Sequence, residues 1–152
     1  MNNLRKGALI GMLSGLITIL GLFLNLFEIK IKDPLTSKDE ILQLSINGIK
    51  SWSDLPSEGQ EAWGIIFNIF LAFAILTIAF SFLSNKRNLL AILTILISLG
   101  NLGFSFLIYK TGSDAFKEVP NFVSFSFGMG MYLLLGGAIL GVVGAILALI
   151  KK

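Results

Sequence analysis

Four long apolar runs, separated by polar stretches, dominate the pattern of this chain. None of them contains Asp, Glu, Lys or Arg. Crossing roughly 30 Å of bilayer hydrocarbon at 1.5 Å per residue takes about 20 apolar residues in a helix. Each run therefore predicts one transmembrane helix. The predicted spans are residues 7–27, 63–83, 89–109 and 127–150, joined by outer loops at 28–62 and 110–126 and an inner turn at 84–88.

The composition agrees with this interpretation. Hydrophobic residues make up 55% of the 152 positions, and the mean hydropathy is +0.84. A water-soluble domain of this size does not need so many apolar residues. We expect a single membrane domain over residues 1–152. Its predicted class is an all-α integral membrane protein, a four-transmembrane-helix bundle.

Charge is divided between the two predicted sides of the membrane. One side carries +6 without any acid, the segment 28–61 carries −3, and the segment 110–118 is neutral. The acid-free side comprises Arg5, Lys6, Lys86, Arg87, Lys151 and Lys152. Because positive charge concentrates in cytoplasmic loops, the partition predicts a multi-pass protein of the plasma (cytoplasmic) membrane with both termini in the cytoplasm.

Small or polar residues recur at helical spacing along one face of each run. Such residues let membrane helices approach closely and form hydrogen bonds between them. We expect the four faces to converge on one bundle axis, although an outward-facing Gly-x-x-x-Gly would favour dimerisation and the oligomeric state stays open. The expected packing positions are Gly11, Gly15, Gly137, Gly141 and Gly144. The second run contributes Gly64, Asn68, Ala72 and Ala79, and the third contributes Thr94, Ser98, Asn101 and Ser105.

Three asparagines lie in the outer halves of the predicted spans. Asn25, Asn68 and Asn101, with Ser98 on the same face as the last, can meet near one level of the bundle. They form either a small polar pocket open to the outside or interhelical hydrogen bonds that hold the bundle together. We favour the second alternative because such contacts, at about 1 kcal/mol each, commonly join membrane helices.

The outer loops have the two-residue alternation of β-strands. Ile29 and Ile31 alternate with Glu28, Lys30 and Lys32. The same pattern recurs at 42–47, where Gly48 can end the strand, and at 123–127 directly before the last span. These three segments predict a small extracellular antiparallel sheet built from both outer loops. The alternative is that they lie along the lipid headgroups. At the end of the first outer loop, Ser57 and Gln60 fit a capping box for the second helix. Trp63, the first residue of the second span, fits an interfacial anchor.

This arrangement of four spans, inner termini and strands in both outer loops resembles the claudin-like architecture of tight-junction proteins and their channel-regulating relatives. That family carries a Trp and Gly-Leu-Trp signature followed by two disulfide-forming cysteines. Here the corresponding stretch is Gly48-Ile49-Lys50-Ser51-Trp52, and the chain contains no cysteine. The resemblance therefore implies a fold rather than a junctional function. The glycine-rich last span is also similar to the closing helix of small bacterial four-span membrane proteins.

Candidate chemistry is sparse. The chain has no His and no Cys, and none of its carboxylates lies within a predicted span. The usual general bases, nucleophiles and metal ligands of a buried active site are therefore missing, and we expect no enzyme, no cofactor and no metal site. The adjacent Asp39 and Glu40 are too unspecific a pair to predict a cation site. No feature indicates nucleic-acid binding.

The remaining expectation is an interaction protein. An ordered, acidic outer region above a chemically inert bundle predicts recognition of a membrane protein, an envelope component or a peptide, as in an immunity, regulatory or assembly subunit. The candidate partner surface comprises Asp39, Glu40, Trp52 and Asp54. The alternative function is a small transporter or channel that uses the Asn/Ser/Thr-lined interior, and the lipid bilayer is a partner in either case.

Overall fold

The structure is a computed structural model that describes residues 6–50, 56–84 and 86–150. Within these ranges the chain forms five α-helices, one short 3₁₀-helix and three strands. In order they are α1 (Lys6–Phe23), β1 (Asn25–Lys32), β2 (Asp39–Ser45), α2 (Ile46–Lys50), α3 (Ser57–Ser84), α4 (Asn88–Ala115), η1 (Phe116–Glu118), β3 (Val123–Phe127) and α5 (Met129–Ile150).

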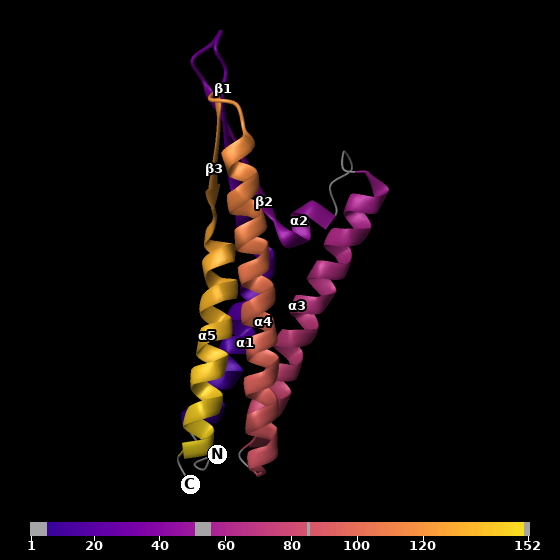
Figure 1. Cartoon of the computed structure of the whole chain (residues 1–152), viewed down its shortest axis with the longest axis vertical. Helices are drawn as coiled ribbons and strands as arrows, with labels where there is room; N and C mark the ends of the chain where they lie inside the picture. The colour runs from indigo at the N-terminus through magenta and orange to yellow at the C-terminus, as the bar shows by residue number, and fades with distance from the viewer. Residues whose placement is uncertain (1–5, 51–55, 85, 151–152) are drawn as a thin grey trace.

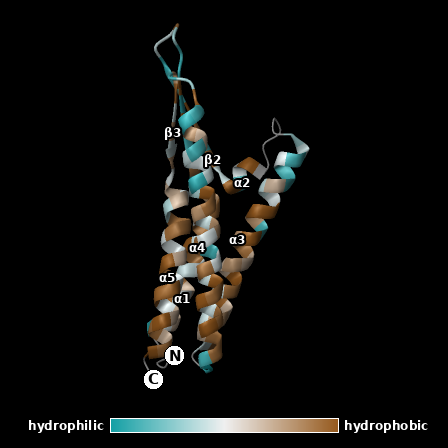
Figure 2. Cartoon of the chain, viewed as in Figure 1, coloured by the Kyte–Doolittle hydropathy of each residue, from teal (hydrophilic) through white to brown (hydrophobic). Residues whose placement is uncertain are grey.

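The four long helices α1, α3, α4 and α5 are each long and apolar enough to cross a membrane. The start of α1, the end of α5 and the connection between α3 and α4 lie at one end of the bundle, and the strands lie at the other (Figure 1). We call these the turn end and the sheet end. Hydrophobic residues predominate along the helices, while hydrophilic residues concentrate in the β1–β2 hairpin and near the sheet ends of α3 and α4 (Figure 2). The fold is a multi-pass membrane bundle that carries a small sheet.

The helix boundaries differ from the predicted ones at the sheet end. The helix predicted for 7–27 ends at Phe23, and β1 already begins at Asn25. Likewise α5 begins at Met129, because Phe127 belongs to β3. Conversely α3 begins at 57 rather than 63, and α4 continues to 115 rather than 109. Residues 25–27 and 127 leave the helices because they pair with other strands, which satisfies their backbone groups as well as a helix does.

The sheet has three antiparallel strands, as the alternation predicts, and their order is β2-β1-β3. Phe27 pairs with Phe127 and Ile29 with Phe125, so the apolar side chains of β1 and β3 share one face. The polar face carries Glu28, which accepts a hydrogen bond from Gln43 Nε2 at 3.4 Å. The predicted second strand is wrong at its end. β2 stops at Ser45, and residues 46–50, including Gly48, form α2, whose first turn is tied by the Gly48 N–H donating to Ser45 Oγ at 2.9 Å.

Three of the four predicted small-residue faces point into the bundle. The small residues of the first, third and fourth runs are buried where the helices meet, with the exception of Asn25 in β1. A Cβ on Gly144 would lie 2.6 Å from the amide nitrogen of Gly11, so α1 and α5 are in backbone contact. The face predicted for α3 is wrong: Asn68 and Ala72 are exposed, and nothing lies within 4 Å of a Cβ built on Gly64.

The buried face of α3 consists instead of Phe67, Phe70, Ala74, Thr77, Ser81 and Ser84. It contains four small or hydroxyl residues, against three small residues and one Asn in the predicted face, and it adds two aromatic rings. Both faces therefore satisfy the rule that small residues pack between membrane helices, and the periodicity alone does not distinguish them. The large rings decide the outcome because they fill the space at the sheet end.

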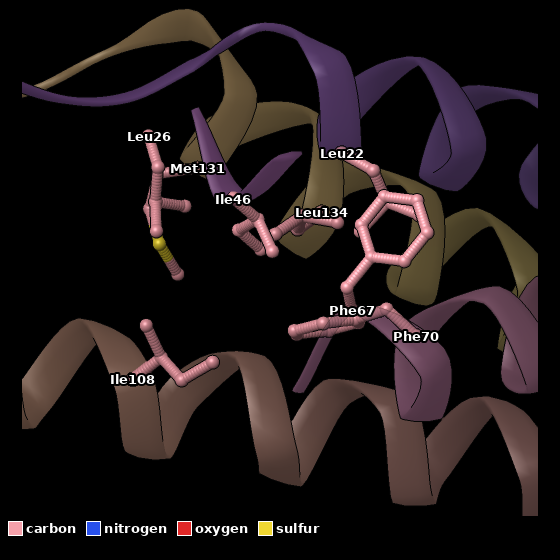
Figure 3. Packing of buried hydrophobic residues seen from close by; sticks show 8 residues of the cluster. All are labelled: Leu22, Leu26, Ile46, Phe67, Phe70, Ile108, Met131 and Leu134. Carbon is pink, nitrogen blue, oxygen red and sulfur yellow. The ribbon is translucent and has the colours of Figure 1, made fainter. Parts of the chain in front are cut away.

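A single apolar cluster joins the helices to the sheet. Its buried members come from α1, β1, α2, α3, α4 and α5 (Figure 3). They are Leu22, Leu26, Ile46, Phe67, Phe70, Ile108, Met131 and Leu134. Because one residue of β1 and one of α2 belong to this cluster, the segments outside the four long helices are packed onto the bundle rather than tethered to it.

Candidate functional site

The sheet is fixed to the bundle by an aromatic cluster around Phe27. Its ring contacts Trp63 of α3 at 6.3 Å, Phe116 of η1 at 5.9 Å and Phe127 of β3 at 5.9 Å between centroids. Tyr109 of α4 stacks on Phe127 at 4.5 Å. Edge-to-face and offset contacts at these distances each stabilise by about 1 kcal/mol beyond simple burial. Trp63, expected as an interfacial anchor, thus also holds the sheet.

Glycines hold the other side of the sheet close to α5. A Cβ on Gly130 would lie 2.5 Å from the carbonyl oxygen of Leu24, and one on Gly128 would meet the backbone of Asn25. The Gly128 N–H donates to the Leu26 carbonyl at 2.9 Å. No side chain fits between the start of β1 and the start of α5. The sheet is therefore held rigidly from two sides.

The surface of the sheet offers an open edge at β2. The strand order leaves the side of β2 away from β1 without a partner strand among the residues that the structure describes. Five of its seven residues are exposed, including Asp39, Glu40 and Ile41, of which Ile41 is 53% exposed. An open edge presents backbone N–H and C=O groups that a further strand can pair with. Trp52 and Asp54 of the predicted partner surface lie outside the described residues.

The hairpin between β1 and β2 is ordered by Asp33. Its carboxylate accepts a hydrogen bond from the Thr36 hydroxyl at 2.6 Å and one from the Leu35 N–H at 2.9 Å. These two bonds lower the pKa of Asp33 below its ordinary value, the Thr36 bond having the larger effect. Ser37 completes the turn with a left-handed φ of 54°. Leu35, 93% exposed, is presented at the tip.

An apolar cleft lies under the sheet, between α3 and α4. The two helices are in contact at the Phe70–Phe104 ring pair, whose centroids are 5.1 Å apart, and they diverge beyond it toward the sheet end (Figure 1). Two adjoining cavities of about 260 and 330 Å³ occupy the space. They share Phe27, Trp63, Gly112 and Ala115 as walls. We refer to the two cavities together as the α3–α4 cleft.

The interior of the bundle contains polar side chains that form hydrogen bonds between helices. Ser14 Oγ donates to the Gly137 carbonyl at 2.6 Å, which joins α1 to α5. Asn101 Nδ2 donates to Thr18 Oγ1 at 3.5 Å, which joins α4 to α1, and Ser105 Oγ donates to Asn101 Oδ1 at the same distance. Asn101 is only 2% exposed. These polar groups thus bond to one another across tightly packed helices.

The predicted cluster of asparagines does not form. Of the four residues predicted to meet there, only Asn101 and Ser98 lie in the interior. Ser98 Oγ is buried without a hydrogen-bond partner among the described residues. Asn25 lies in β1, while Asn68 is exposed on the outer side of α3. The asparagines separate because α1 ends before Asn25 and because α3 turns its other face inward. The glycines Gly11, Gly15, Gly137, Gly141 and Gly144 all lie in the helix contacts.

The sequence pattern did not indicate the α3–α4 cleft. Its walls come from β1, β2, α2, α3, α4, η1 and β3, and all the lining residues except Thr111 are apolar in a chain that is 55% hydrophobic. The one available signal was the extension of apolar positions beyond residue 109, at Gly112, Ala115 and Phe116. No family model matches the sequence, and no curated protein is significantly similar to it.

Proposed function

We propose that this chain is a non-enzymatic membrane protein that recognises a partner through its sheet. The partner is a membrane protein, an envelope component or a peptide, and the chain acts as an immunity, regulatory or assembly subunit. The observation that carries the proposal is the open edge of β2 on a sheet that aromatic and glycine contacts hold rigidly. A rigid edge binds an extended segment without first having to become ordered, which favours affinity.

The proposal includes an orientation. The turn end carries Lys6, Lys86 and Arg87 among its described residues, whereas the acidic residues gather near the sheet. By the positive-inside rule the turn end faces the cytoplasm and the sheet faces outward from the plasma (cytoplasmic) membrane. Strands from two outer loops above four spans also agree with a claudin-like arrangement.

Interior packing favours recognition over transport. A solute path needs polar groups that face an open space, whereas here Asn101, Thr18 and Ser14 bond to neighbouring helices. Gly141 is packed so closely that a Cβ there would lie 2.8 Å from Ser14 Oγ. Opening a path along this face would break these contacts and separate the helices.

Site-specific photo-crosslinking in native membranes tests the proposal. A photoreactive residue at Ile41, in the open edge strand, is compared with one at Leu96, which is 59% exposed on α4 and far from the sheet. We expect an adduct of defined mass from Ile41 and not from Leu96. The proposal fails if Ile41 gives no adduct, or if both positions give the same ones. Solute uptake or ion current in liposomes that contain only this protein would support transport instead.

A further inference from the structure

We propose that the α3–α4 cleft holds an acyl chain of a phospholipid from the surrounding bilayer. This inference is independent of partner recognition by the sheet. It rests on the cleft's lining, on its opening to the lipid-facing surface of the helices, and on a cation close to that opening.

The lining admits an apolar occupant. Ile29, Leu44 and Phe125 of the sheet form the roof, and Ile66 and Ile108 form part of the walls. The larger cavity adds a single hydroxyl, that of Thr111. A buried water needs two to four polar partners, and a polar solute left without hydrogen bonds is disfavoured by several kcal/mol. Neither finds such partners here.

The cleft is continuous with the lipid-facing surface. Leu107 lines the larger cavity and is also 61% exposed. Elsewhere on the same two helices, Phe106 of α4 is 59% exposed and Ile65 of α3 is 58% exposed. In a helix that crosses the membrane such exposed apolar side chains face hydrocarbon. A lipid chain therefore enters sideways, without passing through water.

The two cavities, of about 260 and 330 Å³, adjoin along the walls that they share. A single hydrocarbon chain, only one methylene wide, can pass from one cavity into the other. The Phe70–Phe104 pair closes the cleft below, and Phe116 closes it above.

A cation lies close to the opening. Lys110 is exposed on α4 one turn beyond Leu107, and residues three apart are neighbours on a helix surface. The other lysine near this end of α4, Lys117, forms an ion pair with Asp114 at 3.2 Å. The ammonium group of Lys110 can therefore meet a lipid phosphate while the acyl chain occupies the cleft. This favours a phospholipid over an uncharged lipid.

The position of Trp63 in both cavities provides the test. A Trp52→Phe background leaves Trp63 as the single tryptophan, since the chain has two. The protein is reconstituted into phosphatidylcholine vesicles whose acyl chains carry bromine, a contact quencher of tryptophan fluorescence. Ala115→Phe fills the cleft, and Ala72→Phe makes the same exchange at an exposed alanine of α3 that does not line it.

We expect strong quenching of Trp63 in the background protein and in Ala72→Phe, and loss of most of it in Ala115→Phe. Native mass spectrometry of the detergent-purified proteins should show one retained phospholipid that Ala115→Phe loses. Thr111→Phe fills the same cavity from another position, so that a folding defect in one variant does not decide the result. Equal quenching and equal lipid retention in all variants would overturn the proposal. A photoreactive residue placed at position 115 that crosslinks to a second protein instead of to lipid would also overturn it.

Discussion

The backbone contact between α1 and α5 makes Gly144→Ala a demanding test of the bundle. A Cβ there would lie 2.6 Å from the Gly11 nitrogen and 2.9 Å from the Gly7 carbonyl oxygen, whereas ordinary contact begins at 3.4 Å. The helices would have to separate by the difference, about 0.8 Å. Overpacking of this kind costs about 1–3 kcal/mol. The helix preference of Ala over Gly offsets about 1 kcal/mol, so we expect a net loss of up to about 2 kcal/mol.

Gly136→Ala is the matched control on the same helix. No heavy atom lies within 4 Å of a Cβ at Gly136, so only the helix preference acts and stability should stay equal or rise by up to about 1 kcal/mol. Both free energies of unfolding are measured by titrating detergent-solubilised protein with SDS and following helix content by circular dichroism. Equal stability of the two variants would refute the backbone contact between α1 and α5.

Three further predictions concern the sheet and the buried polar groups. Asn101→Leu should lower the free energy of unfolding in the same SDS titration by about 1 kcal/mol, because it breaks hydrogen bonds to α1 and within α4. The control Asn68→Leu should not lower it, because that side chain is exposed. Phe27→Ala removes the centre of the aromatic cluster and should cost about 3 kcal/mol, with faster hydrogen exchange in the strands than in the helices. Because hydrogen bonds lower the pKa of Asp33, its ionised form stabilises the hairpin at neutral pH. That stability should be lost as the pH falls below about 4, and hydrogen exchange of the hairpin amides should become faster. Asp33→Asn should remove this pH dependence.

The sequence predicted the four apolar helices and the three strands because both features are local. Charge-free runs of about 20 residues have few alternatives in a bilayer. In the strands, the alternation of Ile29 and Ile31 with charged neighbours predicts one apolar face, and the register places Leu42, Phe125 and Val123 on that face. Ile41 is the exception, because it pairs with Lys30 on the polar face. The antiparallel pairing followed from having three such segments at one end of the bundle.

The remaining features depend on contacts between distant segments. Residues 25–27 belong to a segment apolar enough for either a helix or a strand, and pairing with β2 and β3 decides in favour of the strand. The face of α3 that points inward is chosen by Phe67 and Phe70, which pack against residues from other helices. The α3–α4 cleft exists because the helices diverge beyond Phe104, and periodicity along one helix carries no information about that angle.

We propose that the sheet is the outward-facing, accessible part of the molecule. The chain has no cysteine, so Lys38→Cys at the hairpin and Lys86→Cys at the connection of α3 and α4 each supply a single thiol. The measurement is labelling of intact cells with a membrane-impermeant maleimide, repeated after permeabilisation. We expect Lys38→Cys to react in intact cells and Lys86→Cys to react only after permeabilisation. The reverse pattern would place the sheet in the cytoplasm and contradict the claim.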